Sequence, residues 1–263
     1  MKDIKVIVAA HKDYQMPKDK MYIPVQVGAE GKKKIENFKQ DNIGENISNK
    51  NPYFCELTGL FWAWKNLNAE YIGLAHYRRH FTKCKKIPKN KEQKFDILLT
   101  QAEADKLLND SDVIVPKLRN YYIENLYKHY EHTMYVEPLD ETGRIIKEKY
   151  PEYYEEFNKL HKRKSAHMFN MFIMKKDVLN EYCIWLFDIL FELEKRIDNS
   201  KYDTFHSRFY GRISELLLDV WLEKNKIKYN EVKVIDMENI NWLKKGTSFL
   251  KAKFTGKKYE RSF

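Results

Sequence analysis

The residues best suited to chemistry in this sequence are two adjacent arginines, Arg78 and Arg79. Residues 71–75 are apolar and predict a short buried strand, and His76 stands at its carboxyl end. In an open α/β sheet, ligands bind beyond the carboxyl ends of the strands. Guanidinium groups are planar and permanently charged, and they contact phosphate at two points. The stretch therefore predicts a phosphate-binding strand end, with a solvated basic turn as the alternative.

A second group of polar residues stands where the same ligand would lie. Residues 5–10 predict a first strand, and His11 and Lys12 follow its carboxyl end. Residues 41–51 are dense in Asn, Asp, Gly and Ser and predict a loop whose donors and acceptors suit a base and a ribose. The alternative is an Asx-rich turn in which Asn51 caps a helix. The predicted nucleotide-binding residues are His11, Lys12, Asp41, Asn46, Ser48, Asn51, His76, Arg78 and Arg79.

Aromatic and amide side chains predict a groove for a second ligand. Tyr121 and His129 belong to a Tyr-rich segment that can line such a groove. His167 and Asn170 are embedded in an apolar run, where polar groups must find partners or serve a ligand. His129 and His132 have helical spacing but no third ligand, so the pattern does not predict a zinc site.

Carboxylates supply the candidate bases and the candidate metal ligands. A helix beginning at Ser214 or Glu215 places Glu215 either as a buried carboxylate, suited to a general base, or as a first-turn acid favoured by the helix dipole. Asp110 and Asp112 match a D-x-D pattern that can hold a divalent cation. They precede a predicted strand, however, at the end away from the ligand. No metal is therefore favoured, and Mn²⁺ or Mg²⁺ is the alternative.

The elements that must position these groups alternate between apolar strands and amphipathic helices, which indicates an α/β fold. Strands are predicted over residues 5–10, 22–27, 71–75, 95–100, 112–116, 166–175 and 229–235. Helices are predicted over 52–67, 101–109, 177–197 and from Ser214 or Glu215 to near Trp221, with 118–160 helical in pieces.

Size and charge narrow the class of protein. The 263 residues, 43% of them hydrophobic, suffice for one large α/β domain. The net charge of +10 suits nucleic acid, an anionic bilayer or a phosphorylated small molecule. Nucleic acid is not expected as a partner, because no basic run alternates with aromatic residues in a groove-reading motif. The three widely spaced cysteines and the lack of a secretory signal predict a reducing cytoplasm.

The last residues differ in composition from the rest of the chain. Residues 242–263 alternate bulky apolar side chains with basic ones, which predicts docking on an anionic membrane face; a frayed basic terminus is the alternative. We therefore predict one domain over residues 1–240 and a basic amphipathic tail over 241–263. No apolar run approaches the roughly 20 residues that cross a bilayer.

Several blocks together resemble a bacterial family long catalogued as a domain of unknown function, whose genes lie in capsule, exopolysaccharide and O-antigen loci. The most specific part is His76-Tyr77-Arg78-Arg79 combined with the upstream Asn-rich loop. The resemblance extends over about residues 3–236. Its blocks are residues 41–51, 56–66, 71–81, 167–172, 182–187 and 211–215.

The resemblance implies a Rossmann-like glycosyltransferase type A fold with a mostly parallel central sheet. Characterised relatives are similar to inverting galactofuranosyltransferases that use a UDP-sugar. The chain is thus expected to transfer a hexose such as galactofuranose from a UDP-sugar donor to a lipid-linked or oligosaccharide acceptor. The expected location is cytoplasmic, peripheral on the inner face of the plasma membrane.

An inverting transfer requires preorganised positive charge at the leaving diphosphate and a base for the acceptor hydroxyl. Arg78 and Arg79 stand where many type A enzymes carry an acidic metal-binding pair, so they are expected to replace the metal wholly or partly. The candidate bases are Glu215, His167 and Asp112, and the candidate acceptor residues are Asn170, Tyr121 and His129. The competing prediction is a non-catalytic peripheral protein that binds anionic polysaccharide or phospholipid.

Overall fold

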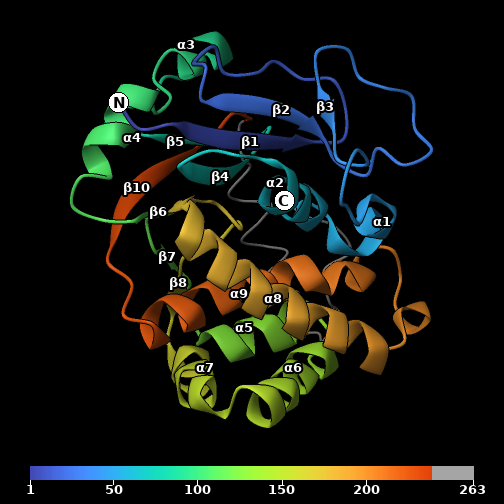
Figure 1. The fold of residues 1–263 in the computed structure, drawn as a ribbon. Helices are drawn as coiled ribbons and strands as arrows, with labels where there is room; N and C mark the ends of the chain where they lie inside the picture. The colour runs from blue at the N-terminus through green and yellow to red at the C-terminus, as the bar shows by residue number, and fades with distance from the viewer. Residues whose placement is uncertain (239–263) are drawn as a thin grey trace.

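The computed structural model describes residues 1–238, which form a mixed sheet covered by helices (Figure 1). Its strands are β1 (Ile4–Ala10), β2 (Tyr22–Gln26), β3 (Lys39–Gln40), β4 (Tyr71–His76), β5 (Arg79–Thr82), β6 (Val113–Pro116), β7 (Arg119–Asn120), β8 (Ser165–Ala166), β9 (Phe172–Lys175) and β10 (Tyr229–Asp236). Its α-helices are α1 (Asn51–Phe54), α2 (Leu57–Asn66), α3 (Lys91–Phe95), α4 (Gln101–Leu107), α5 (Leu126–Thr133), α6 (Glu137–Lys149), α7 (Tyr154–Lys162), α8 (Lys176–Arg196) and α9 (Phe209–Lys224). The predicted tail over 241–263 lies outside the described residues.

The large sheet has the strand order β3-β2-β1-β4-β5-β10-β6-β9, and β4 also pairs with β9. Strands β3, β2, β1 and β4 are mutually parallel, as are β10 and β6. Strands β5 and β9 run antiparallel to their neighbours. The α/β class is confirmed, but the mostly parallel sheet is only partly so. A two-residue turn joins β4 to β5, and a connection that short permits only an antiparallel pair.

Alternating side chains of the central strands serve two separate cores. In β1, Val6 and Val8 pack toward the face that α4 covers, whereas Ile7 and Ala9 pack toward α2, α8 and α9. Both sets are buried, as expected for parallel strands with helices on both sides. Below α8 and α9, helices α5, α6 and α7 form a further layer (Figure 1).

Four predicted elements differ from the structure. Residues 95–100 form no strand: α3 ends at Phe95, and Leu99 N–H donates to Phe81 O at 2.8 Å as an isolated bond. The segment 166–175 is divided, because Phe169 and Asn170 adopt positive φ between β8 and β9. The helix predicted over 52–67 is broken into α1 and α2 at Cys55, whose φ is 53°.

The fourth difference concerns the helix that carries Glu215. It begins at Phe209 and not at Ser214 or Glu215, so Glu215 lies at the end of its second turn. A carboxylate in that position does not sit at the first-turn amides. The helix-dipole explanation of Glu215 therefore does not apply.

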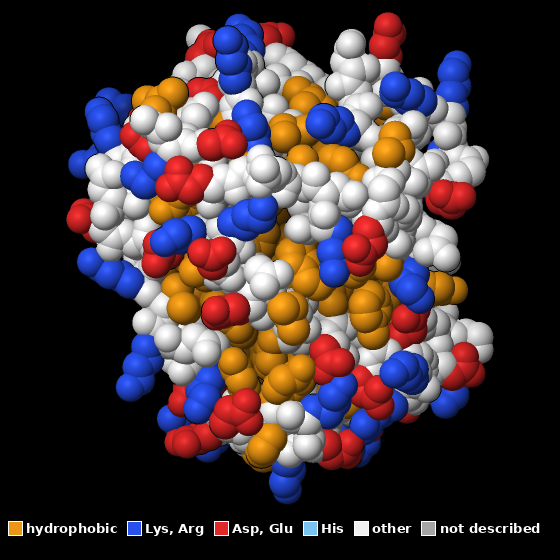
Figure 2. Space-filling model, viewed as in Figure 1, with side chains coloured by type: hydrophobic (Ala, Val, Ile, Leu, Met, Phe, Trp, Pro, Cys, Tyr) orange, Lys and Arg blue, Asp and Glu red, His pale blue; other side chains and the backbone are white. Residues whose placement is uncertain are grey.

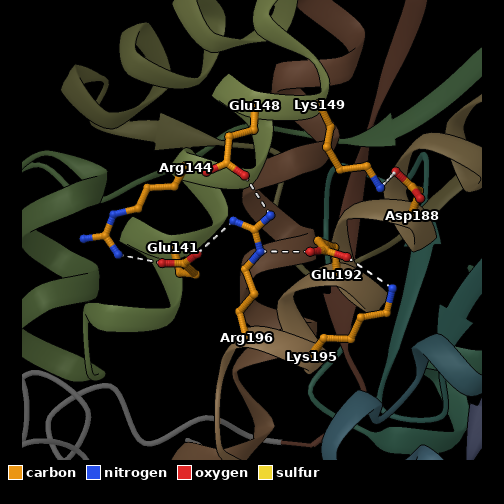
Figure 3. Close-up of polar contacts among 8 residues, drawn as sticks. All are labelled: Glu141, Arg144, Glu148, Lys149, Asp188, Glu192, Lys195 and Arg196. Atoms are coloured by element: carbon orange, nitrogen blue, oxygen red, sulfur yellow. Dashed lines mark hydrogen bonds and ion pairs between the residues drawn. The ribbon is translucent and has the colours of Figure 1, made fainter.

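A surface ion network joins α6 to α8 (Figure 3). The Arg196 guanidinium contacts Glu141 at 3.2 Å, Glu148 at 2.7 Å and Glu192 at 2.9 Å. Lys149 pairs with Asp188 between the same two helices at 2.5 Å. These charges neutralise one another across the outer helical layer and stabilise the packing of α6 on α8.

Candidate functional site

The parallel strands β1 and β4 bring two polar segments together at their carboxyl ends. Ala9 of β1 lies in register with His76 of β4, so His11 and the residues after His76 emerge at one edge of the sheet. Phe169, Asn170 and the beginning of α9 reach the same edge, since His76 Nε2 lies 2.5 Å from Phe169 O and Asn170 Nδ2 donates to Gly211 O at 2.8 Å. We call the group that meets here the carboxyl-edge cluster. Its members are His11, Glu56, His76, Arg78, Arg79, Arg119, Phe169, Arg208, Arg212 and Glu215.

Arginines from three separate segments dominate this cluster. Arg79 lies over the Phe169 ring at 4.7 Å, and Arg119 lies over the same ring at 5.5 Å. Arg208 Nε lies 2.9 Å from Cys55 Sγ. Burial lowers the pKa of His11, and Lys12, Arg78 and Arg208 lower it further. This side of the cluster is therefore strongly positive around a neutral imidazole.

Glu215 is the carboxylate that these arginines surround. It is half-buried, and burial raises its pKa to about 7. That value is the net result of several charges, because the neighbouring Glu56 carboxylate also raises the pKa, whereas Arg212, Arg79 and Arg119 lower it. A carboxylate that titrates near neutral pH is suited to take a proton from a hydroxyl group.

Glu56 and Asn170 hold the cluster together. Asn170 is buried and donates from Nδ2 to Glu56 Oε1 at 2.7 Å as well as to the α9 backbone. His76 is half-buried beside this contact: burial lowers its pKa, Glu56 raises it and Arg79 lowers it. A carbonyl oxygen only accepts, so the contact with Phe169 O requires a proton on His76 Nε2.

Five of the residues predicted to bind the nucleotide lie at this edge: His11, Lys12, His76, Arg78 and Arg79. Lys12 Nζ and the Arg78 guanidinium both lie over the Tyr77 ring, at 5.6 and 5.2 Å. Arg78 is exposed and pairs with Glu238 at 3.2 Å, whereas Arg79 is half-buried and donates from Nε to Asp236 at 2.9 Å. Arg78 thus lies in the β4–β5 turn and Arg79 begins β5, and each guanidinium pairs with a different carboxylate.

The Asn-rich loop is a framework and not a set of free donors and acceptors. Asp41 is fully buried, and its carboxylate accepts from Gly28 N at 2.8 Å, Ala29 N at 2.9 Å, Ser48 Oγ at 2.5 Å and Thr58 Oγ1 at 2.6 Å. A Cβ added to Gly28 would lie 2.3 Å from Asn51 Oδ1, so the loop packs tightly there.

Asn51 and Asn46 complete this framework. Asn51 Nδ2 donates to Cys55 O at 2.7 Å, and the residue lies inside α1, so its predicted role as a cap is wrong. Asn46 closes its own turn through Gly44 O and Ser48 N. Asp41 and Ser48 are buried and bond within the loop, so we correct them from nucleotide contacts to structural residues, whereas the nucleotide contacts predicted for Asn46 and Asn51 stay predictions.

Replacing Asp41 by Asn is expected to lower the free energy of unfolding by about 3 kcal/mol. The amide would turn an NH₂ group toward donors that now meet a carboxylate oxygen, which leaves buried hydrogen-bonding groups unsatisfied. Urea denaturation measures the change. Asp110→Asn, at an exposed aspartate, serves as the control and should unfold like the wild type.

Two of the predicted bases lie away from the cluster. Asp112 precedes β6, and Lys175 N–H donates to its carbonyl, so it belongs to the amino edge of the sheet beside the start of β4. His167 is buried, with Nδ1 bonded to Asp219 and Nε2 3.0 Å from Glu231 Oε1. Burial lowers the pKa of His167, but Asp219 and Glu231 outweigh that and raise it. Glu215 therefore remains the candidate base at this edge.

The predicted acceptor residues adjoin the cluster through Arg119. The Arg119 guanidinium lies 5.3 Å from the Tyr121 ring, and the Tyr121 and His129 rings are 4.1 Å apart. Both His129 and His132 contact the buried Glu124, at 3.3 and 2.8 Å. Asn170 uses its amide hydrogens within the protein, so it positions the site.

Five cluster residues were missed by sequence reasoning: Glu56, Arg119, Phe169, Arg208 and Arg212. Only Glu56 carried a local signal, as a polar intrusion in an apolar helical pattern. Two surface hollows of about 300 and 290 Å³ lie elsewhere, the first beside Trp62 and the second beside Tyr53, and no cluster member lines either.

Within residues 1–238, no group of three or more His, Cys, Asp or Glu side chains is arranged to hold a metal ion. Over the same residues, no helix combines the length and the apolar character that crossing a bilayer requires.

Comparisons with known proteins give two matches. A family model described as "Domain of unknown function (DUF4422)" matches residues 5–226. Among solved structures, the chain is similar to the bifunctional glycosyltransferase WbbM in its apo form, with 28% sequence identity and a TM-score of 0.82. The match covers 90% of this chain and 46% of that one, so the chain spans about half the length of WbbM. The comparison with curated proteins finds no match.

Proposed function

The chain belongs to the DUF4422 family, and from the chemistry of its carboxyl-edge cluster we propose that it is an inverting glycosyltransferase acting on a UDP-sugar. The observation that carries the proposal is Glu215, a half-buried carboxylate with a pKa near 7 among arginines. The similarity to a glycosyltransferase of known structure supports the same class of reaction.

The proposed reaction assigns a separate role to each charge. The Glu215 carboxylate takes the proton of the acceptor hydroxyl as that oxygen bonds to the anomeric carbon from the face opposite the diphosphate. The bond between the anomeric carbon and the phosphate oxygen breaks, and its electron pair leaves with UDP. Arg78 and Arg79 stabilise the charge that develops on the diphosphate, which favours the transition state over the ground state.

We propose that these guanidinium groups take the place of a divalent cation. Arg208 and Arg212 add positive charge near Glu56 from the beginning of α9. Tyr121, His129 and Arg119 form the adjoining surface, where we propose that the acceptor glycan binds. We propose a hexose such as galactofuranose as the sugar that the UDP donor carries, and a lipid-linked or oligosaccharide glycan as the acceptor.

A nucleotide panel tests the proposal. UDP should raise the melting temperature of the purified protein more than ADP or GDP does, and incubation with UDP-sugars should release UDP in the presence of an acceptor glycan. Stabilisation by anionic polysaccharide but by no nucleotide would instead favour a non-catalytic binding protein.

Replacing Glu56 by Gln should move the acid limb of the pH–rate profile to lower pH. Glu215 must be ionised to accept a proton, so kcat/KM is expected to rise with pH through about 7. The Glu56 charge raises the pKa of Glu215, and its removal lets Glu215 ionise at lower pH. The variant should therefore retain a larger fraction of its own maximal activity at pH 6. An unmoved acid limb would contradict the assignment of Glu215.

A further inference from the structure

The loop at residues 117–125, which runs from β6 to α5 and contains the short strand β7, exposes apolar side chains beside the carboxyl-edge cluster. Of the eight large hydrophobic side chains exposed among residues 1–238, three lie in this loop: Leu118 at 39%, Tyr122 at 78% and Ile123 at 57%. We call these three residues the docking tip. We propose that the docking tip inserts into the interface of an anionic lipid bilayer.

The backbone around the docking tip is held in place. Tyr121 N–H donates to Lys164 O and Leu126 N–H donates to Arg163 O, both at 2.8 Å, and β7 pairs with β8. Tyr122 adopts a φ of 54°, which is unusual for a bulky residue, and Lys164 Nζ donates to its carbonyl oxygen at 3.3 Å. The tip is therefore presented on a fixed base, so insertion requires little ordering of the loop.

The charges around the docking tip favour an anionic partner. Lys117, Lys162 and Lys164 are exposed on the two segments that meet at its base. The acid within the loop, Glu124, is buried against His129 and His132. Exposed tyrosine and isoleucine flanked by lysine match the requirements of an anionic bilayer interface, where rings and aliphatic groups enter the boundary and lysines meet the headgroups.

The docking tip lies beside the proposed acceptor surface, so its contact with a bilayer would serve the proposed transfer. Arg119 and Tyr121 belong to the same loop and form the surface next to Glu215. A bilayer at Tyr122 and Ile123 would bring a membrane-anchored glycan to that surface. This last step rests on the proposed function, whereas the docking itself does not.

Another exposed apolar side chain supplies a matched control. Ile184 is 53% exposed on α8. On the face shown in Figure 2, hydrophobic side chains gather over the middle, and Lys, Arg, Asp and Glu side chains of both signs surround them. A surface of mixed charge lacks the excess of positive charge that attracts anionic lipid.

Sedimentation of the full chain with phosphatidylcholine vesicles, with and without phosphatidylglycerol, tests the proposal. The wild type should bind only the phosphatidylglycerol vesicles. Tyr122→Ser combined with Ile123→Ser leaves the net charge unchanged and should weaken this binding about tenfold or more, because two apolar side chains no longer enter the interface. Ile184→Ser should bind like the wild type.

Three outcomes would overturn the proposal: no vesicle binding by the wild type, undiminished binding by the double variant, or an equal loss in Ile184→Ser. The melting-temperature shift with UDP is measured on the same variants. An unchanged UDP shift in the double variant shows that it is folded. A protein that binds vesicles but not UDP would contradict the proposed function, but it would not contradict membrane insertion of the docking tip.

Discussion

Glu215→Gln is expected to lower kcat by about 10³-fold while UDP binds as tightly as before. The amide keeps the size and polarity of the side chain but has no basic site for the acceptor proton. Glu215 lies among Arg79, Arg119 and Arg212, and burial raises its pKa to about 7, so it ionises at the pH where a base is needed. UDP release in the presence of acceptor measures kcat, and calorimetry with UDP measures binding.

The control for this variant is Glu181→Gln, at an exposed glutamate on α8. It should turn over normally. Normal turnover by Glu215→Gln would exclude Glu215 as the base. No other predicted base could hide its loss, because Asp112 lies at the opposite edge and both His167 ring nitrogens are bonded to carboxylates.

Arg79→Met is expected to lower kcat by about 10²-fold or more. Methionine keeps much of the side-chain length but removes the charge that we place against the leaving diphosphate. Arg78→Met should have a smaller effect, because Arg78 is more exposed, where solvent screens its charge. Activity with and without EDTA measures whether these guanidinium groups replace a metal.

Arg144→Met, at an exposed arginine of the α6–α8 network, serves as the control and should leave activity unchanged (Figure 3). Activity lost in EDTA, together with normal activity in Arg79→Met, would contradict the proposed role of the arginines.

The sequence predicted the strand ends because their signals are local. Apolar runs followed by polar residues placed His11 and His76 at one edge, and the parallel pairing of β1 with β4 confirms that they meet. The same kind of signal failed for residues 95–100, where burial of Leu98 and Leu99 is achieved in a turn beside β5. An apolar run alone does not distinguish a strand from a buried turn.

The remainder of the cluster depends on contacts between distant segments. Arg119 and Arg208 reach Phe169 and Cys55 from positions 50 and 153 residues away, which no local pattern encodes. The Asp41 loop shows the converse: its composition suits a nucleotide, but its acceptors are occupied by Gly28, Ala29, Ser48 and Thr58. Whether a polar loop binds a ligand or its own chain is decided by packing.

A structure of the protein with bound UDP tests the central claim most directly. We predict that the diphosphate lies within hydrogen-bonding distance of Arg78 or Arg79, with the Glu215 carboxylate on the side where the acceptor enters. Diphosphate bound far from both arginines, or no binding at saturating UDP, would contradict the account.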